Sequence, residues 1–175
     1  MTFRCWGVGA LGLMSVTVPA VGQNATADLK DIDGKEVGKA TFVQTHSGVL
    51  IRVSIKNLPA GNLAFHVHAV GDCEPPFLTA GPHFNPDGRK HGLEAPDGAH
   101  GGDMPNLHIP PNGNLEVEVI NTAISLEKGK ANSVFDFDGS ALVLHANADD
   151  IEPILLATPA IASFAASSKN DQESE

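Results

Sequence analysis

Short segments in which apolar and polar residues alternate constrain the fold of this chain more than any other feature of its sequence. Residues 25–29, 39–44 and 49–56 show this alternation, which places the apolar side chains on one face of a strand. Turn-forming residues at Asp33-Gly34 and His46-Ser47-Gly48 separate them and are typical of antiparallel hairpins. The chain also holds 18 Gly and 12 Pro and only 5% aromatic residues, which favours many short elements joined by turns. An all-β domain is therefore predicted.

Three more strands are expected later in the chain, at residues 65–70, 114–120 and 141–145. The first two are separated by a stretch from Gly71 to Asn106 that is rich in Gly and Pro and has almost no periodicity. A loop of this length inside a compact domain is usually functional or disordered. At 175 residues the chain is long enough for one domain and too short to expect two.

The first 22 residues differ in composition from the rest. Arg4 supplies a positive charge, an apolar run begins at Cys5, and Ala20-Val21-Gly22 offers small residues to a signal peptidase. The apolar run is shorter than the roughly 20 residues that a membrane-spanning helix needs, although a retained membrane anchor is the alternative. We expect residues 1–22 to be a cleaved secretory signal peptide. Cleavage would leave Cys73 alone, which is unusual for an exported domain.

Histidines are concentrated in and around the long loop. Six of the eight histidines lie between positions 66 and 108, and His145 follows on a predicted strand. His66 and His68 are separated by one residue on a strand, so both side chains project from one face and can bind one metal ion. Paired imidazoles suit copper or zinc. Such a pair is by itself weak evidence for a metal site.

A second group of metal-binding residues lies within the loop. His83 occurs in the segment G-P-H-F-N-P, His91 follows eight residues later, and His100 precedes Asp103 by three residues. Three histidines and one aspartate are typical of a closed, tetrahedral zinc site. The carboxylate favours zinc over cuprous copper.

In their order and spacing, these segments resemble the metal-site pattern of the copper,zinc superoxide dismutases. The motifs are H-V-H at 66–68, G-P-H-F-N-P at 81–86, K-H-G at 90–92, H-G-G-D at 100–103 and L-V-L-H-A-N-A-D-D at 142–150. The resemblance covers about residues 25–150, and the cysteine in G-D-C, five residues after His68, is similar to that of the bacterial periplasmic branch. It implies a Greek-key β-sandwich, or flattened eight-stranded barrel, with a long metal-binding loop.

The resemblance also implies a set of ligands for each of the two metals. Copper is assigned to His66, His68, His83 and His145, and zinc to His83, His91, His100 and Asp103. His83 is then the bridge and the catalytic residue, and its ring must lose both nitrogen protons to bind both ions. Asp149 matches a carboxylate that accepts hydrogen bonds from one ligand of each metal, by position His66 and His91. A solvated loop acid is the alternative for Asp149.

The activity implied is dismutation of superoxide to dioxygen and hydrogen peroxide in the periplasm, with copper as the redox metal and zinc holding His83 and the loop. One alternative is a family member that binds copper and zinc but has weak or no dismutase activity. Another is a structural β-sandwich whose histidines never meet. His46, in an expected hairpin turn, and His108, which has no motif partner, are not expected to be ligands.

The charge of the chain restricts its partners. The formal net charge is −10 and the pI is near 5.1, which argues against nucleic acid or an anionic membrane surface as a partner. After signal cleavage no membrane attachment is expected. Superoxide is the expected small-molecule substrate, and the oligomeric state stays open, a homodimer being one alternative.

The chain departs from the family pattern after Asp150. The family ends in a stretch like G-N-A-G-x-R-I-A-C-G-V-I, which supplies an arginine that draws superoxide to copper, a cysteine that pairs with the loop cysteine, here Cys73, and the last strand. Residues 151–175 contain no Arg and no Cys. The expected domain therefore spans residues 23–150 and is followed by a divergent tail. The last strand is doubtful, and an open sheet edge is expected.

A reading frame shifted by one base accounts for this ending. Each new codon keeps the first two bases of a present codon as its last two, so residues 158–170 allow N-A-G-D-R-I-V-C-G-V-I-E-K, and Asp171 allows a stop codon. Arg then falls at position 162 and Cys at position 165. We infer a one-base deletion near Asp150, either a mutation of the gene or an error in its sequence. We expect metal binding by the present chain to survive better than turnover.

Overall fold

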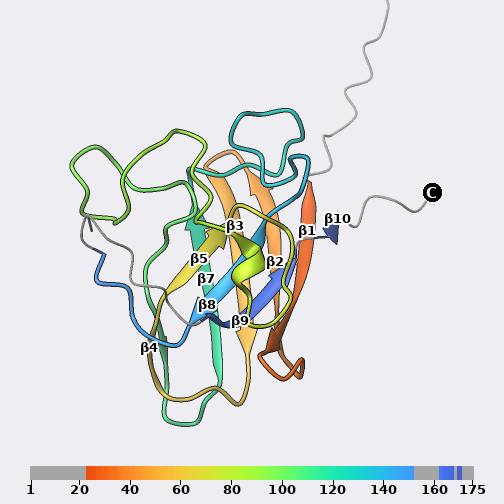
Figure 1. Cartoon of the computed structure of the whole chain (residues 1–175), viewed down its shortest axis with the longest axis vertical. Helices are drawn as coiled ribbons and strands as arrows, with labels where there is room; N and C mark the ends of the chain where they lie inside the picture. Colours follow the sequence, from red (N-terminus) through yellow and green to blue (C-terminus); the bar gives the residue numbers. More distant parts are fainter. Residues whose placement is uncertain (1–22, 152–161, 168, 171–175) are drawn as a thin grey trace, which may run out of the picture.

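The computed structural model describes residues 23–151, 162–167 and 169–170, and in this part the regular secondary structure is almost entirely antiparallel strand, joined by long loops (Figure 1). The strands are β1 (Asn24–Asp31), β2 (Glu36–Thr45), β3 (Gly48–Ile55), β4 (Gly61–Leu63), β5 (Phe65–His68), β6 (Leu107–Ile109), β7 (Leu115–Asn121), β8 (Ala141–His145), β9 (Ala162–Ser167) and β10 (Lys169–Asn170). One turn of 3-10 helix, η1 (Leu78–Ala80), is the only helix in the described residues. None there could cross a membrane. The all-β prediction is confirmed, and the predicted signal peptide lies outside the described residues.

The strand order is that of a Greek key. The main sheet runs β5-β8-β9-β1-β2-β3-β7, with β10 also beside β1, and β4 pairs with β6 in a small second sheet. Consecutive hairpins join β1, β2 and β3, and β9 returns from the far end of the chain to pair with β1. The spatial order β9-β1-β2-β3 is the one that defines a Greek key.

The main sheet curves until its two ends share one hydrophobic core. Val67 of β5 and Leu144 of β8 belong to the same buried cluster as Ile51 of β3, although these strands are far apart in the sheet order. Leu107 and Ile109 of the small sheet join this cluster. The sandwich or flattened barrel implied by the sequence is thus confirmed. It follows from alternation, since every second residue of a strand faces inward.

The predicted hairpins form where the turn residues are. Gly48 begins β3 with φ 129°, and a Cβ at this position would lie 2.4 Å from the carbonyl oxygen of Asn121. Glycine is therefore required at this turn. The strands β4 and β6 were not predicted, because three residues are too few to show an alternating pattern.

Strand β9 corrects one expectation about the ending of the chain. The divergent tail was expected to leave a sheet edge open, but Ala162–Ser167 pairs with β8 on one side and β1 on the other. Strand pairing uses the backbone N–H and C=O groups that every residue but proline carries, so a changed sequence can still occupy this place. The register sets residue 162 opposite His145 and residue 165 opposite Val143.

Candidate metal centre

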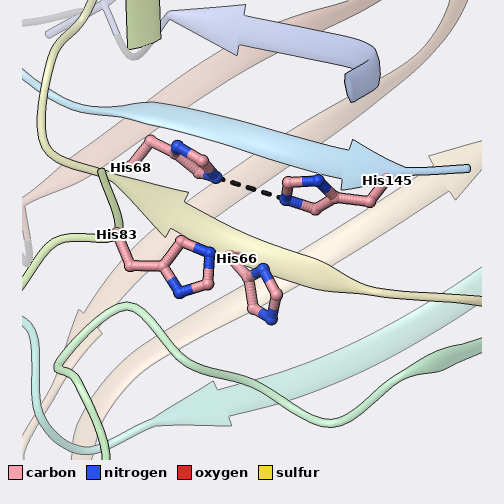
Figure 2. A group of neighbouring side chains, drawn as sticks. All are labelled: His66, His68, His83 and His145. Carbon is pink, nitrogen blue, oxygen red and sulfur yellow. Dashed lines mark hydrogen bonds between the residues drawn. The ribbon is translucent and has the colours of Figure 1, made fainter. Parts of the chain in front are cut away.

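Four histidine rings meet where β5 lies beside β8 and the loop after β5 folds back over them (Figure 2). His66 and His68 come from β5, His145 is the last residue of β8, and His83 comes from the loop. A single β-bridge joins the backbones of His68 and His83. The loop approaches β5 closely at Gly102 as well, where a Cβ would lie 2.1 Å from the carbonyl oxygen of Val67. This explains the second glycine of the H-G-G-D segment.

Hydrogen bonds fix which nitrogen of each β5 histidine is free. His66 Nε2 donates to Asp149 Oδ2 at 2.8 Å, and His68 Nδ1 donates to the carbonyl oxygen of Gly81 at 2.7 Å. The second nitrogen of a neutral ring then carries a lone pair. His66 Nδ1 is buried without a hydrogen-bond partner in the described residues, and His68 Nε2 lies 3.2 Å from His145 Nε2. Lone pairs directed into one buried space are what a bound cation satisfies.

The second group surrounds the carboxylate of Asp103. Its Oδ1 lies 2.8 Å from His83 Nδ1 and 3.4 Å from His100 Nδ1, and its Oδ2 lies 3.3 Å from His91 Nδ1. His91 Nε2 donates to Asp149 Oδ1 at 2.9 Å, so the lone pair on His91 Nδ1 faces a carboxylate oxygen. Two acceptors that face each other need a proton or a metal ion between them, and here the carboxylates of Asp149 and Asp103 outweigh burial and raise the pKa of His91. Three imidazole nitrogens and one carboxylate form the donor set of a tetrahedral zinc site.

The ring of His83 is shared by the two groups. Its Nδ1 belongs to the group around Asp103, while its ring centroid lies 4.0 Å from that of His66 and 4.9 Å from that of His68. In each group of four, one ligand atom from every residue lies within 4.8 Å of the others, and His83 is the common member. The ring can therefore offer Nδ1 to one ion and Nε2 to another.

The carboxylate of Asp149 also links the same two groups. It accepts hydrogen bonds from His66 of the first group and His91 of the second. Burial raises the pKa of Asp149, but the hydrogen bonds from these two rings outweigh it and hold the pKa well below its usual range. Asp149 is therefore a carboxylate at neutral pH and fixes the orientation of both rings.

Burial keeps the rings that meet at β5 and β8 neutral. It lowers the pKa of His68 to about 4 and that of His145 to about 3, and neighbouring histidines add to the shift. A neutral imidazole is the form that binds a metal ion. Asp103 also has a lowered pKa, about 2, because the hydrogen bonds and charges around it outweigh its burial.

We expect the metal-free protein to lose stability as the pH falls from about 6.5 toward 4. The pKa values of His68 and His145 in the folded chain, about 4 and about 3, lie below the ordinary 6.5. Between these limits the unfolded chain binds protons that the folded chain does not, so the stability is full above pH 6.5 and falls below it. Denaturant unfolding at a series of pH values measures this, and the variant with His68→Gln and His145→Gln should show a weaker dependence. A flat profile for the unsubstituted chain contradicts the expectation.

The structure brings all the predicted metal ligands of β5, β8 and the long loop into one region. His46 and His108 lie outside both groups. His46 is exposed in its hairpin turn, and His108 Nδ1 contacts Asn62 Oδ1 at 2.8 Å on the surface. Asn106, which hydrogen-bonds to the backbone of Asp149, was missed by sequence reasoning because no motif marks it.

Cys73 has a free, partly buried thiol. It packs against a small cluster that includes Ala141 and Val143 of β8. Burial, together with the charges of Asp72 and Glu74, raises the pKa of this thiol to about 12. The thiol is therefore protonated and a poor nucleophile at neutral pH.

Comparison with known proteins gives consistent matches. A family model described as copper/zinc superoxide dismutase matches residues 36–166, which runs past Asp150 into β9. The Cu-Zn superoxide dismutase 1 of Aquifex aeolicus is 50% identical over 126 residues, or 71% of this chain and 75% of the relative. That of Caulobacter vibrioides is 38% identical over 130 residues, or 73% of this chain and 75% of the relative. The crystal structure of a SOD-like protein from Bacillus subtilis has a TM-score of 0.73 at 33% identity, covering 81% of this chain and 96% of that one.

Proposed function

Because the chain belongs to the copper/zinc superoxide dismutase family, we propose that it dismutates superoxide at a copper site joined to a zinc site through His83. The observation that carries the proposal is the sharing of the His83 ring by two groups of metal-binding side chains. A protein with separate copper and zinc sites would not need one ring in both groups. The substrate is superoxide, and two superoxide anions with two protons give dioxygen and hydrogen peroxide.

The free nitrogens support one assignment of the ligands. Copper would be held by His66 through Nδ1, by His68 and His145 through Nε2, and by His83 through Nε2. Zinc would be held by Nδ1 of His83, His91 and His100 and by the carboxylate of Asp103. The orphaned His66 Nδ1 and His91 Nδ1 support this donor set, which suits the two metals. For His145, whose Nδ1 is also buried without a partner in the described residues, the 3.2 Å between its Nε2 and His68 Nε2 favours Nε2 as the donor.

The residues of the site divide the work of the reaction. When bound, copper supplies the one-electron redox chemistry of dismutation. When it is not bound to copper, His83 Nε2 is the atom at which the chain can hold a proton and pass it to the leaving product, which is too basic to leave as a dianion. Asp149 keeps the rings of His66 and His91 in the tautomer and orientation that binding needs.

Residues 151–175 favour a second candidate function. They contain no arginine, and their one basic residue is Lys169, so the arginine that draws superoxide to copper in the family pattern is missing from a chain that is acidic as a whole. A copper- and zinc-binding member of the family with weak or no dismutase activity fits this feature. Metal binding needs only the residues of the two groups, which all precede the divergent segment.

We also propose that the chain is exported to the periplasm after cleavage of residues 1–22. The positive start and apolar run of this segment support the proposal, and a relative 36% identical over 117 residues is the extracellular Cu-Zn superoxide dismutase of Haemonchus contortus. We further propose that it has no nucleic-acid partner, no membrane attachment after cleavage, and a monomeric or homodimeric state. Mass spectrometry of the exported protein tests the cleavage: an intact Met1 would contradict it.

Metal analysis and superoxide decay on the same preparation test the proposed function. We expect one copper and one zinc per chain, and first-order loss of superoxide in pulse radiolysis at a rate proportional to the protein concentration. When chelators remove the metals, only the slower second-order spontaneous decay should remain. The variant His108→Ala is the matched control, because this histidine lies outside both groups, and it should behave like the unsubstituted chain. Two bound metals without faster superoxide decay would favour the second candidate, and binding of neither metal would contradict both.

A further inference from the structure

The side chain of Asn106 closes two hydrogen bonds on the backbone of one residue, Asp149. Asn106 Nδ2 donates to the carbonyl oxygen of Asp149 at 2.7 Å, and Asn106 Oδ1 accepts from the Asp149 N–H at 2.8 Å. Both polar ends of the amide thus hold a residue 43 positions further along the chain. We propose that Asn106 is a positioning residue that fixes Asp149 and, through it, the orientation of one ligand of each metal. This inference rests on the function proposed above.

Asp149 needs such an anchor because it lies beyond the sheet. It is the fourth residue after His145, where β8 ends, so no strand pairing holds its backbone. Its carboxylate is already engaged by His66 and His91 and by the N–H of Ile151 at 3.1 Å. In the described residues, the hydrogen bonds of its backbone N–H and C=O go to Asn106.

Asn106 itself is held in place by the fold. It is half-buried and directly precedes β6, whose first residue, Leu107, belongs to the main core. It also lies three residues after Asp103, so one short segment supplies a zinc ligand and holds the carboxylate that orients His66 of the copper group. The position of Asp149 is therefore set from a part of the chain that precedes the divergent ending. This accounts for how both groups stay assembled in a chain whose last residues depart from the family.

A double-mutant cycle on the full chain tests the inference. We expect Asn106→Ala to weaken zinc binding, measured by competition with a chromophoric chelator, by about 10-fold, the lower end of the 10- to 100-fold typical of partners that orient ligands. The copper(II) electron paramagnetic resonance spectrum should change in the same variant. In an Asp149→Asn background the effect of Asn106→Ala on zinc binding should shrink to less than about 2-fold, since residues that act through each other are not additive.

Two further variants keep the result interpretable. Asn132 also donates from its side-chain amide to a backbone carbonyl, that of Ala123 at 2.9 Å, but on the exposed surface. Asn132→Ala should leave both metal readouts unchanged. If Asn106→Ala does not fold, Asn106→Asp takes its place. It keeps the acceptor for the Asp149 N–H and loses the donor to the Asp149 C=O, so an intermediate loss of zinc affinity is expected.

The outcomes separate this inference from the function on which it rests. Unchanged zinc affinity in Asn106→Ala, or an equal loss with and without the Asp149 carboxylate, overturns the role of Asn106 while the metal sites stand. A loss of stability in the metal-free variant with normal metal binding also overturns it, because it shows a merely structural bond. Failure of the unsubstituted chain to bind either metal overturns the proposed function and this inference with it.

Discussion

Replacement of His83 with alanine is expected to lower the rate of superoxide dismutation by at least about 100-fold, because partners that only orient ligands already contribute about 10- to 100-fold. The substitution removes a nitrogen from both groups of ligands at once, and with it the atom proposed to carry a proton to the product. Pulse radiolysis with the metal content measured in the same sample checks this. Both copper and zinc affinity should fall.

His100→Ala is the matched control for this prediction. His100 belongs to the zinc group and not to the copper group, so its loss should weaken zinc binding while copper binding falls much less. Equal losses of copper affinity in the two variants would show that His83 contributes no more to the copper site than His100 does. A His83→Ala variant that keeps most of its activity would contradict the proposed mechanism outright.

Restoring the family ending by correcting the reading frame is expected to give the second large effect. The new frame places Arg at position 162, which the register of β9 sets opposite His145, and Cys at position 165, opposite Val143 in the cluster that Cys73 contacts. We expect the rate of superoxide capture to rise by about 10-fold or more at low salt, because a positive charge near the site steers the anion. A disulfide with Cys73 should add about 2–4 kcal/mol to the free energy of unfolding.

Single substitutions in the present chain separate the two contributions. Ala162→Arg should recover much of the rate and make it fall with ionic strength, with little change in stability. Ala165→Cys should recover stability that a reducing agent removes, with little change in rate. If the unsubstituted chain already matches the restored one in rate and stability, the divergent ending has no functional cost, and sequencing the gene near Asp150 becomes the decisive check on the frame.

Much of the candidate site could be predicted from the sequence because metal ligation depends on a few residue types at fixed spacing. His66 and His68 are two apart on one strand, and the spacing from His83 to Asp103 lies within one loop. Such local patterns can be recognised without knowledge of the fold. The structure adds what spacing cannot give: which nitrogen is free in His66, His68 and His91, and that the ring of His83 is shared by the two groups.

Other features of the structure have no recognisable pattern in the sequence. Asn106 acts through backbone atoms of a distant residue, and any sequence around Asp149 would present the same atoms to it. The pairing of β9 was missed for a related reason, since the prediction depended on side-chain pattern, whereas the strand is joined to β8 and β1 through its backbone. Interactions in which the backbone supplies one or both partners are therefore the ones that the sequence pattern does not reveal here.

The measurement that tests the shared histidine most directly is anomalous X-ray scattering from crystals of the metal-loaded chain, recorded on both sides of the copper and zinc absorption edges. We predict a copper peak among His66, His68, His83 and His145, a zinc peak among His83, His91, His100 and Asp103, and contact of both with the ring of His83. A single peak, or two metals of which only one touches His83, would contradict it.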